Sequence, residues 1–98
     1  MKINTQIKLK DLSGKELPGE NTFGQFLANI LIQSKTGGKM KMYTLATKLY
    51  NDKSVEVDAS DLSLIKESIK TTEVYTGLVS GQCELLLEDI KEINIVEN

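Results

Sequence analysis

The chain has 98 residues, 40% hydrophobic and 27% charged, which suits a single compact domain spanning residues 1–98. Its formal net charge is -2 at pH 7, every basic residue is a lysine, and histidine is absent. The lack of histidine excludes the usual Ser-His-Asp triads and the common zinc sites, and the single cysteine excludes an intrachain disulfide.

Charge is unevenly distributed along the sequence. Residues 1–53 carry nine lysines and four acids, a balance of +5, whereas residues 54–98 carry three lysines and ten acids, a balance of -7. This split favours head-to-tail self-association or a charged protein partner, although two solvated faces of different charge would explain it equally well. The absence of arginine disfavours a nucleic-acid partner, because the guanidinium fork is widely used to recognise guanine and phosphate.

The N-terminal residues predict a β-hairpin. Apolar and polar residues alternate over residues 3–9, a period typical of a half-buried strand. Residues 11–14 have turn chemistry, and residues 15–17 are suited to a short return strand that Pro18 and Gly19 end. Such a hairpin is not stable alone, so we expect it to pack on the helices that follow.

The clearest helix follows, with Asn21 or Thr22 as its cap and Gln25 placed to complete a capping box with Thr22. Its apolar stripe consists of Phe23, Phe26, Leu27, Ile30 and Leu31. The spacing predicts the central core helix, ending before a break at residues 36–38.

A second helix is predicted over residues 39–51. The alignment of Tyr43, Ala46 and Tyr50 predicts that both tyrosines lie on its inner line. Lys39, Lys41 and Lys48 are expected to give it a basic flank. Because single-stranded nucleic acid is bound by exposed aromatics in a basic groove, buried tyrosines would argue against that function. Residues 55–57 alternate again and are expected to add a strand to the hairpin.

Two further helices complete the predicted fold. Asp58 caps the third, with Asp61 in its first turn. The last is expected to begin near residue 72 or 73 and to end near residue 92, with Cys83 as a buried structural thiol. The apolar residues 93–96 fit either a pairing strand or an oligomer contact. The predicted fold is α+β and mainly helical, with about four helices on a small N-terminal antiparallel hairpin or sheet.

Several short segments resemble a group of small phage and prophage proteins. They are TFG at residues 22–24, YTLATKLY at 43–50, VEVD at 55–58, LIK at 64–66, and LVSGQ at 78–82 running into LLLE at 85–88. The resemblance covers most of residues 3–88 and implies a phage-encoded origin. It carries over no functional residue and no cofactor.

The sequence favours binding over catalysis, since no motif supplies paired acid–base groups, a P-loop or a calcium loop. The candidate interaction residues are Gly77, Gly81, Gln82, Lys39, Lys41 and Lys48. Gly77 and Gly81, four apart, would permit close approach of another backbone. Gln82 needs a polar partner, and bonding to the backbone of its own chain is the simpler interpretation.

We therefore expect a non-enzymatic, phage-encoded accessory protein that binds a host or phage protein. The alternatives are a homo-oligomeric structural or assembly component of a phage and a weak nucleic-acid-binding protein. No apolar run reaches the ~20 residues that span a bilayer, and residues 1–6 lack a secretory signal. We expect no cofactor, no membrane association and a location in the host-cell cytoplasm.

Overall fold

The structure, a computed structural model, describes residues 2–19, 22–35, 38–75 and 77–97, with residues 89–97 described by their backbone. Its elements are β1 (Lys2–Asn4), α1 (Phe23–Ile32), α2 (Lys39–Asn51), β2 (Ser54–Glu56), α3 (Ala59–Thr71) and α4 (Gly77–Glu97). These elements form an α+β, mainly helical fold, which confirms the predicted class. None of the helices in the described part of the chain combines the length and apolarity needed to cross a membrane.

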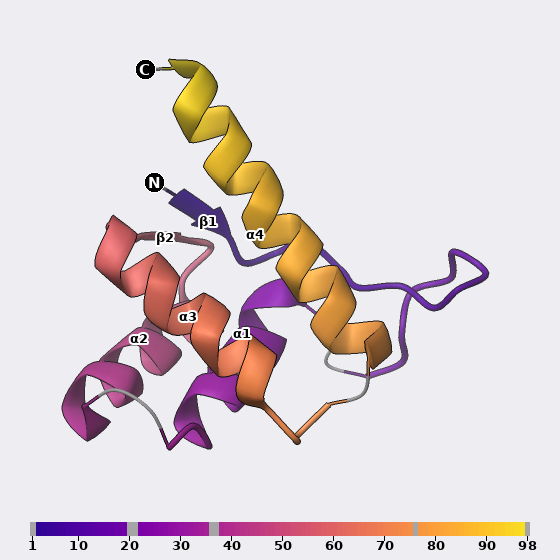
Figure 1. Ribbon diagram of the computed structural model, residues 1–98. Helices are drawn as coiled ribbons and strands as arrows, with labels where there is room; N and C mark the ends of the chain where they lie inside the picture. Colours follow the sequence, from indigo (N-terminus) through magenta and orange to yellow (C-terminus); the bar gives the residue numbers. More distant parts are fainter. Residues whose placement is uncertain (1, 20–21, 36–37, 76, 98) are drawn as a thin grey trace.

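Helix α1 lies at the centre of the molecule and packs against each of the other helices (Figure 1). Its most deeply buried side chains, each at most 1% exposed, are Phe23, Leu27, Ile30 and Leu31. The predicted core helix is confirmed. Thr22 caps it through the predicted box, since Gln25 N donates to Thr22 Oγ1 at 3.3 Å and Thr22 N donates to Gln25 Oε1 at 3.1 Å. The alternative cap, Asn21, and most of the predicted break, residues 36–37, lie outside the described residues.

At Gly24, α1 closely approaches both α2 and the N-terminal segment. The backbone N of Gly24 donates to Thr5 O at 3.0 Å. A Cβ on Gly24 would overlap the carbonyl oxygen of Leu49 and would lie 2.5 Å from Thr5 Cβ. Thr5 is itself 1% exposed, and its hydroxyl donates to Asp52 O. Because no side chain fits between these groups, the site requires glycine.

Strands β1 and β2 pair antiparallel, with Ile3 opposite Val55. The expected strand near residues 55–57 is therefore confirmed as a partner of the N-terminal strand. The first strand is shorter than predicted, because Asn4 Oδ1 accepts a hydrogen bond from Gln6 N at 2.9 Å. This Asx turn diverts the backbone from the extended conformation.

The predicted hairpin persists only as isolated pairing. Lys10 forms a β-bridge with Glu16, and Leu17 N donates to Leu9 O at 3.0 Å. Asp11 organises the turn between them, since its carboxylate accepts hydrogen bonds from a hydroxyl and two backbone N–H groups of the turn. The chain reverses direction where predicted, but without two continuous strands.

The buried side of α2 differs from the prediction. Its buried residues are Met42, Leu45, Ala46 and Leu49. In contrast, Tyr43 is 61% exposed and Tyr50 is 42% exposed. The prediction that both tyrosines lie on the inner line is therefore wrong. The side chains at positions 42, 45, 46 and 49 form the side of α2 that packs against α1. Tyr43 and Tyr50 lie at the border of that side and remain exposed.

Helix α3 begins as predicted, and α4 begins later than predicted. Asp61 N donates to Asp58 Oδ1 at 2.7 Å within a complete capping box. Thr72 ends α3 in an extended conformation, and its hydroxyl accepts a hydrogen bond from Val74 N at 3.1 Å. This local bond competes with helix formation, so the start predicted near residue 72 or 73 is wrong.

Tyr75 fixes the connection between α3 and α4. Its ring packs edge-on against Phe26, with centroids 5.0 Å apart, and its hydroxyl accepts a hydrogen bond from Asn29 Nδ2 at 2.9 Å. Both partners belong to α1. The connection is therefore held by tertiary contacts to the central helix, which local sequence patterns do not reveal.

Helix α4 crosses the molecule, and its last turns extend past β1 (Figure 1). Cys83 lies on its inner face at 0% exposure, and burial raises the pKa of the thiol to about 12, which confirms a buried thiol. Residues 93–96 are helical, so the alternative of a pairing strand is wrong. The side chains of that segment lie outside the described residues.

Replacing two helical glycines should change stability in opposite directions. Gly24→Ala should lower the free energy of unfolding by about 1–3 kcal/mol, because the new methyl group overlaps backbone and Thr5. Gly81→Ala should raise it by about 1 kcal/mol, because a Cβ there meets nothing within 4 Å and alanine favours helix. Urea denaturation of both variants measures the difference, and equal effects would contradict this packing.

Candidate interaction surfaces

The two glycines singled out on α4 face open space. A Cβ on Gly77 or on Gly81 would meet no heavy atom within 4 Å. Neither glycine is therefore needed for packing within the described part of the chain. Their predicted role, close approach of another backbone, has no counterpart inside that part of the molecule.

Gln82 joins α4 to the N-terminal segment. Its Oε1 accepts a hydrogen bond from Lys10 N at 3.0 Å, and its Nε2 donates to Lys10 O at 2.6 Å. The same Nε2 also lies 3.1 Å from Leu78 O. The interpretation that Gln82 bonds to backbone of its own chain is confirmed, and its amide acts as a two-point attachment for residue 10.

Gln82→Glu should loosen this attachment. A carboxylate accepts the Lys10 N–H bond but cannot donate to Lys10 O, so one hydrogen bond is replaced by repulsion. We expect a loss of about 1 kcal/mol of unfolding free energy. If residue 10 opens locally, its amide should exchange roughly fivefold faster.

The measurement is amide hydrogen exchange by NMR. Gln33→Glu, at the exposed end of α1, is the matched control. Unchanged exchange at Lys10 in Gln82→Glu would contradict the attachment.

The three candidate lysines do not form one flank, which corrects the prediction. Lys39 and Lys41 point about 160° apart around a helix of 3.6 residues per turn, whereas Lys48 lies on the same side as Lys41. Lys41 Nζ lies 2.9 Å from Asp61 Oδ1. This hydrogen-bonded ion pair lowers the pKa of Asp61 and raises the pKa of Lys41, and it connects α2 to α3.

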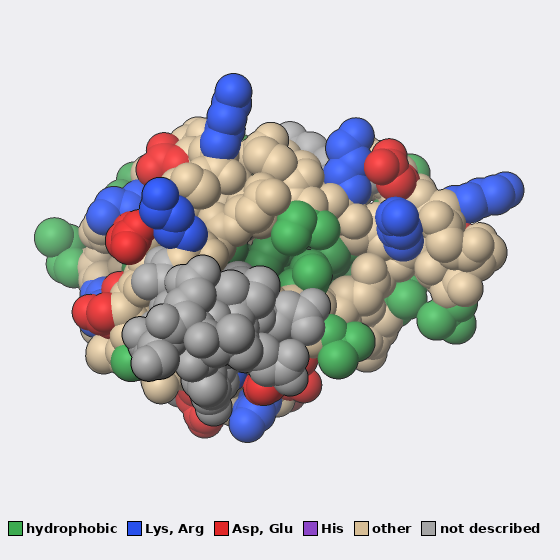
Figure 2. Space-filling model, turned by 90° about the horizontal axis from the view of Figure 1, so that it is seen from above, with side chains coloured by type: hydrophobic (Ala, Val, Ile, Leu, Met, Phe, Trp, Pro, Cys, Tyr) green, Lys and Arg blue, Asp and Glu red, His purple; other side chains and the backbone are tan. Residues whose placement is uncertain are grey.

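The uneven charge along the sequence does not become two separate faces on the side of the molecule drawn in Figure 2, where Lys and Asp or Glu side chains lie close together. Lys41 belongs to the basic half of the sequence and Asp61 to the acidic half, so this ion pair joins the two halves, whereas Lys8–Glu16 and Lys66–Glu88 each lie within one half. The charged side chains that line each groove therefore indicate the binding partner better than the net charge of either half of the sequence does.

A groove of about 470 Å³ lies where α1 ends and α2 begins. We call it the α1–α2 groove, and it is lined by Leu31, Ile32, Ser34, Lys35, Lys39, Met42 and Tyr43. Ile32 is 50% exposed and Tyr43 is 61% exposed, and Met40, which lies one turn from Tyr43, is 82% exposed. The described lining contains lysines and no acid. The groove thus combines exposed apolar and aromatic surface with positive charge.

A second groove, of about 380 Å³, lies between α3 and α4. We call it the α3–α4 groove, and it is lined by Lys66, Lys70, Gly81, Glu84, Leu85 and Glu88. An ion pair joins its walls, with Lys66 Nζ 3.2 Å from Glu88 Oε1. Leu85 is 69% exposed, so it lies away from the buried side of α4 that contains Cys83. Of the two predicted glycines, Gly81 borders this groove.

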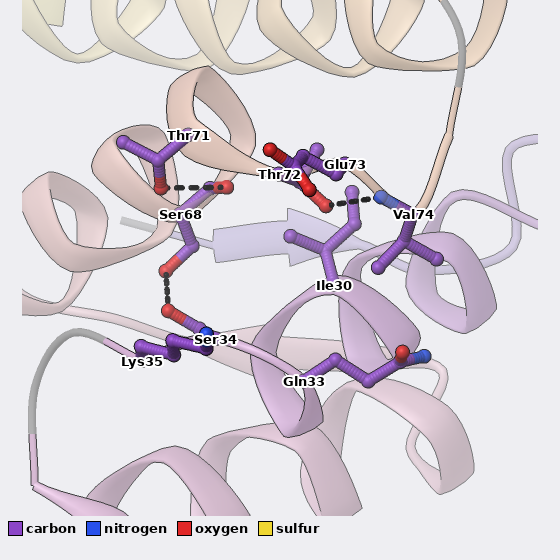
Figure 3. Close-up of a pocket in the computed structure, with 9 residues that line it drawn as sticks. All are labelled: Ile30, Gln33, Ser34, Lys35, Ser68, Thr71, Thr72, Glu73 and Val74. Carbon is purple, nitrogen blue, oxygen red and sulfur yellow. Dashed lines mark hydrogen bonds between the residues drawn. The ribbon is translucent and has the colours of Figure 1, made fainter.

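A pocket of about 460 Å³, lined by both polar and apolar residues, lies between the ends of α1 and α3 (Figure 3). Its hydroxyl groups bond within the chain: Ser68 Oγ donates to Ser34 Oγ at 3.2 Å, and Thr71 Oγ1 donates to Glu67 O at 3.0 Å. Lys35 and Glu73 bring opposite charges to the same lining. Sequence reasoning missed this pocket, because its residues come from separated segments and form no local motif.

Throughout the described residues, no cluster of three or more Cys, Asp or Glu side chains is placed to hold a metal ion. In the same part of the chain, no buried side-chain nitrogen or oxygen lacks a hydrogen-bond partner. No protein-family model, curated protein or solved structure matches this chain. The α1–α2 groove and the α3–α4 groove are therefore the candidate sites.

Proposed function

We propose that this chain is a phage-encoded accessory protein that binds a host or phage protein, without catalysis, through its α1–α2 groove. The observation that carries the proposal is the exposure of Tyr43, at 61%, beside a groove with lysines on its rim. Tyrosine and methionine are enriched at protein interfaces, where a rigid aromatic ring and an adaptable thioether supply contact area. The neighbouring Met40 extends the same surface.

The chemistry of the groove defines the partner. Buried Leu31 and Met42 form an apolar floor, which suits one or two aliphatic or aromatic side chains. Lys35 and Lys39 stand at the rim, where they favour carboxylates that flank those apolar residues. The partner is therefore a protein segment with apolar anchors and acidic neighbours.

The phage origin rests on the resemblance of short segments. Several residues in those segments have structural roles: Thr22 caps α1, Gly24 permits its close packing, and Ala46 and Val55 are buried. A pattern made of such residues is expected where a fold is shared. The proposed phage origin thus rests on the resemblance itself, while the groove supports the binding role.

Nucleic-acid binding is the second candidate, and one observation favours it. Buried tyrosines would disfavour this function, yet Tyr43 is exposed on the groove that Lys39 also lines. A base could stack on this ring while the lysines contact phosphate. Such binding would be sequence-tolerant and would weaken steeply with salt.

Replacing Tyr43 tests the proposed groove. Tagged protein is used to capture partners from phage-infected cells, and the captured protein is then titrated against purified variants. We expect Tyr43→Ala to weaken binding about 30-fold, or about 2 kcal/mol, because central aromatic anchors carry much of an interface's affinity. Lys39→Glu should slow association, since it reverses a rim charge.

Leu12→Ser is the matched control, because Leu12 is 96% exposed on the distant N-terminal turn. Equal binding by wild type, Tyr43→Ala and Lys39→Glu would contradict the groove as the site. Salt-sensitive binding of single-stranded oligonucleotides that Tyr43→Ala abolishes, with no protein captured, would instead establish the second candidate.

A further inference from the structure

The α3–α4 groove has walls of opposite charge. Lys66 and Lys70 line it from α3, while Glu84 and Glu88 line it from α4. Between these walls Leu85, a large apolar side chain, is 69% exposed. The groove therefore offers an apolar contact between a positive and a negative row.

The register of the two rows follows from the packing of the helices. Figure 1 shows α3 and α4 side by side and running in opposite directions. The ion pair between Lys66 and Glu88, at 3.2 Å, fixes one level of the groove. Lys70 lies one turn further along α3 and Glu84 one turn back along α4, so these two residues share the next level.

This arrangement is complementary to itself. A two-fold axis running along the groove places α4 of one copy over α3 of the other, and the reverse. Each glutamate row then faces the lysine row of the other copy at the same level, and the two Leu85 side chains meet near the axis. Gly81, one turn away, leaves room for the approaching helix, since a Cβ there meets nothing within 4 Å.

We propose that the occupant of the α3–α4 groove is a second copy of this chain, giving a two-fold symmetric dimer. The charge pattern selects this occupant, because an unrelated partner would need both rows in the matching order. The α1–α2 groove is formed by other residues, so the dimer does not depend on the proposed function. Self-association also supports the homo-oligomeric assembly role that the sequence leaves open.

The first test is the solution mass as a function of concentration, measured by analytical ultracentrifugation. Wild type should move from the monomer mass of 10.9 kDa toward twice that value as its concentration rises. Leu85→Ser should remain at the monomer mass over the same range. Leu12→Ser, which removes an even more exposed leucine, should behave as wild type.

A pair of charge-reversal variants makes the test specific for the two-fold arrangement. One variant is Lys66→Glu with Lys70→Glu, and the other is Glu84→Lys with Glu88→Lys. Each variant alone presents rows of the same sign, so its dissociation constant should rise more than about tenfold. Mixed in equal amounts, the two variants present opposite rows to each other, and the dimer should re-form.

A wild type that stays monomeric at every concentration overturns the proposal. So does a dimer that Leu85→Ser leaves intact, or a mixture of folded charge-reversal variants that fails to recover the dimer mass. Circular dichroism confirms that each variant is folded, and Leu85→Ser decides the matter if the reversal variants do not fold. If no captured protein depends on Tyr43 for binding but the dimer still forms, the proposed function fails and the dimer proposal stands.

Discussion

The rest of the structure depends on the close contact at Gly24. At this residue the first turn of α1 meets the Leu49 carbonyl at the end of α2 and the buried Thr5 that follows β1. Thr5 also bonds to Asp52 O, just before β2 begins. One residue without a side chain thus sets the spacing of α1, α2 and the sheet, and the other helices pack onto that arrangement.

This arrangement determines where binding surfaces are found. Because α1 is surrounded by the other helices, it offers surface chiefly at its end, where Ile32 is half-exposed and the α1–α2 groove opens. Helix α4 packs through its inner face at Cys83, so Gly81 and Leu85 remain on the outside beside α3. Each groove lies at the edge of a contact between two helices, and its lining residues come from both helices.

The sequence predicted features that depend on neighbours a few residues apart. The capping boxes at Thr22 and Asp58 are of this kind, as is the apolar stripe of α1. Features decided by distant residues were missed. Tyr43 is exposed because other residues of α2 cover α1, and the connection from α3 to α4 is held by the contact of Tyr75 with Phe26. The candidate residues were found in part, since Gly81 and Lys39 border grooves while Gln82 and Lys41 bond within the chain.

Folding also changes the meaning of the charge split along the sequence. A basic first half and an acidic second half suggest two opposed faces, yet both signs lie close together on the face drawn in Figure 2, and the Lys41–Asp61 pair joins the two halves. The α3–α4 groove has lysines on one wall and glutamates on the other. A second copy of the chain, turned by a two-fold axis, presents the opposite charge to each wall. The lining of the α1–α2 groove carries lysines alone, so its preference is for an acidic partner. Selectivity therefore arises from the local order of charges in each groove and not from net charge.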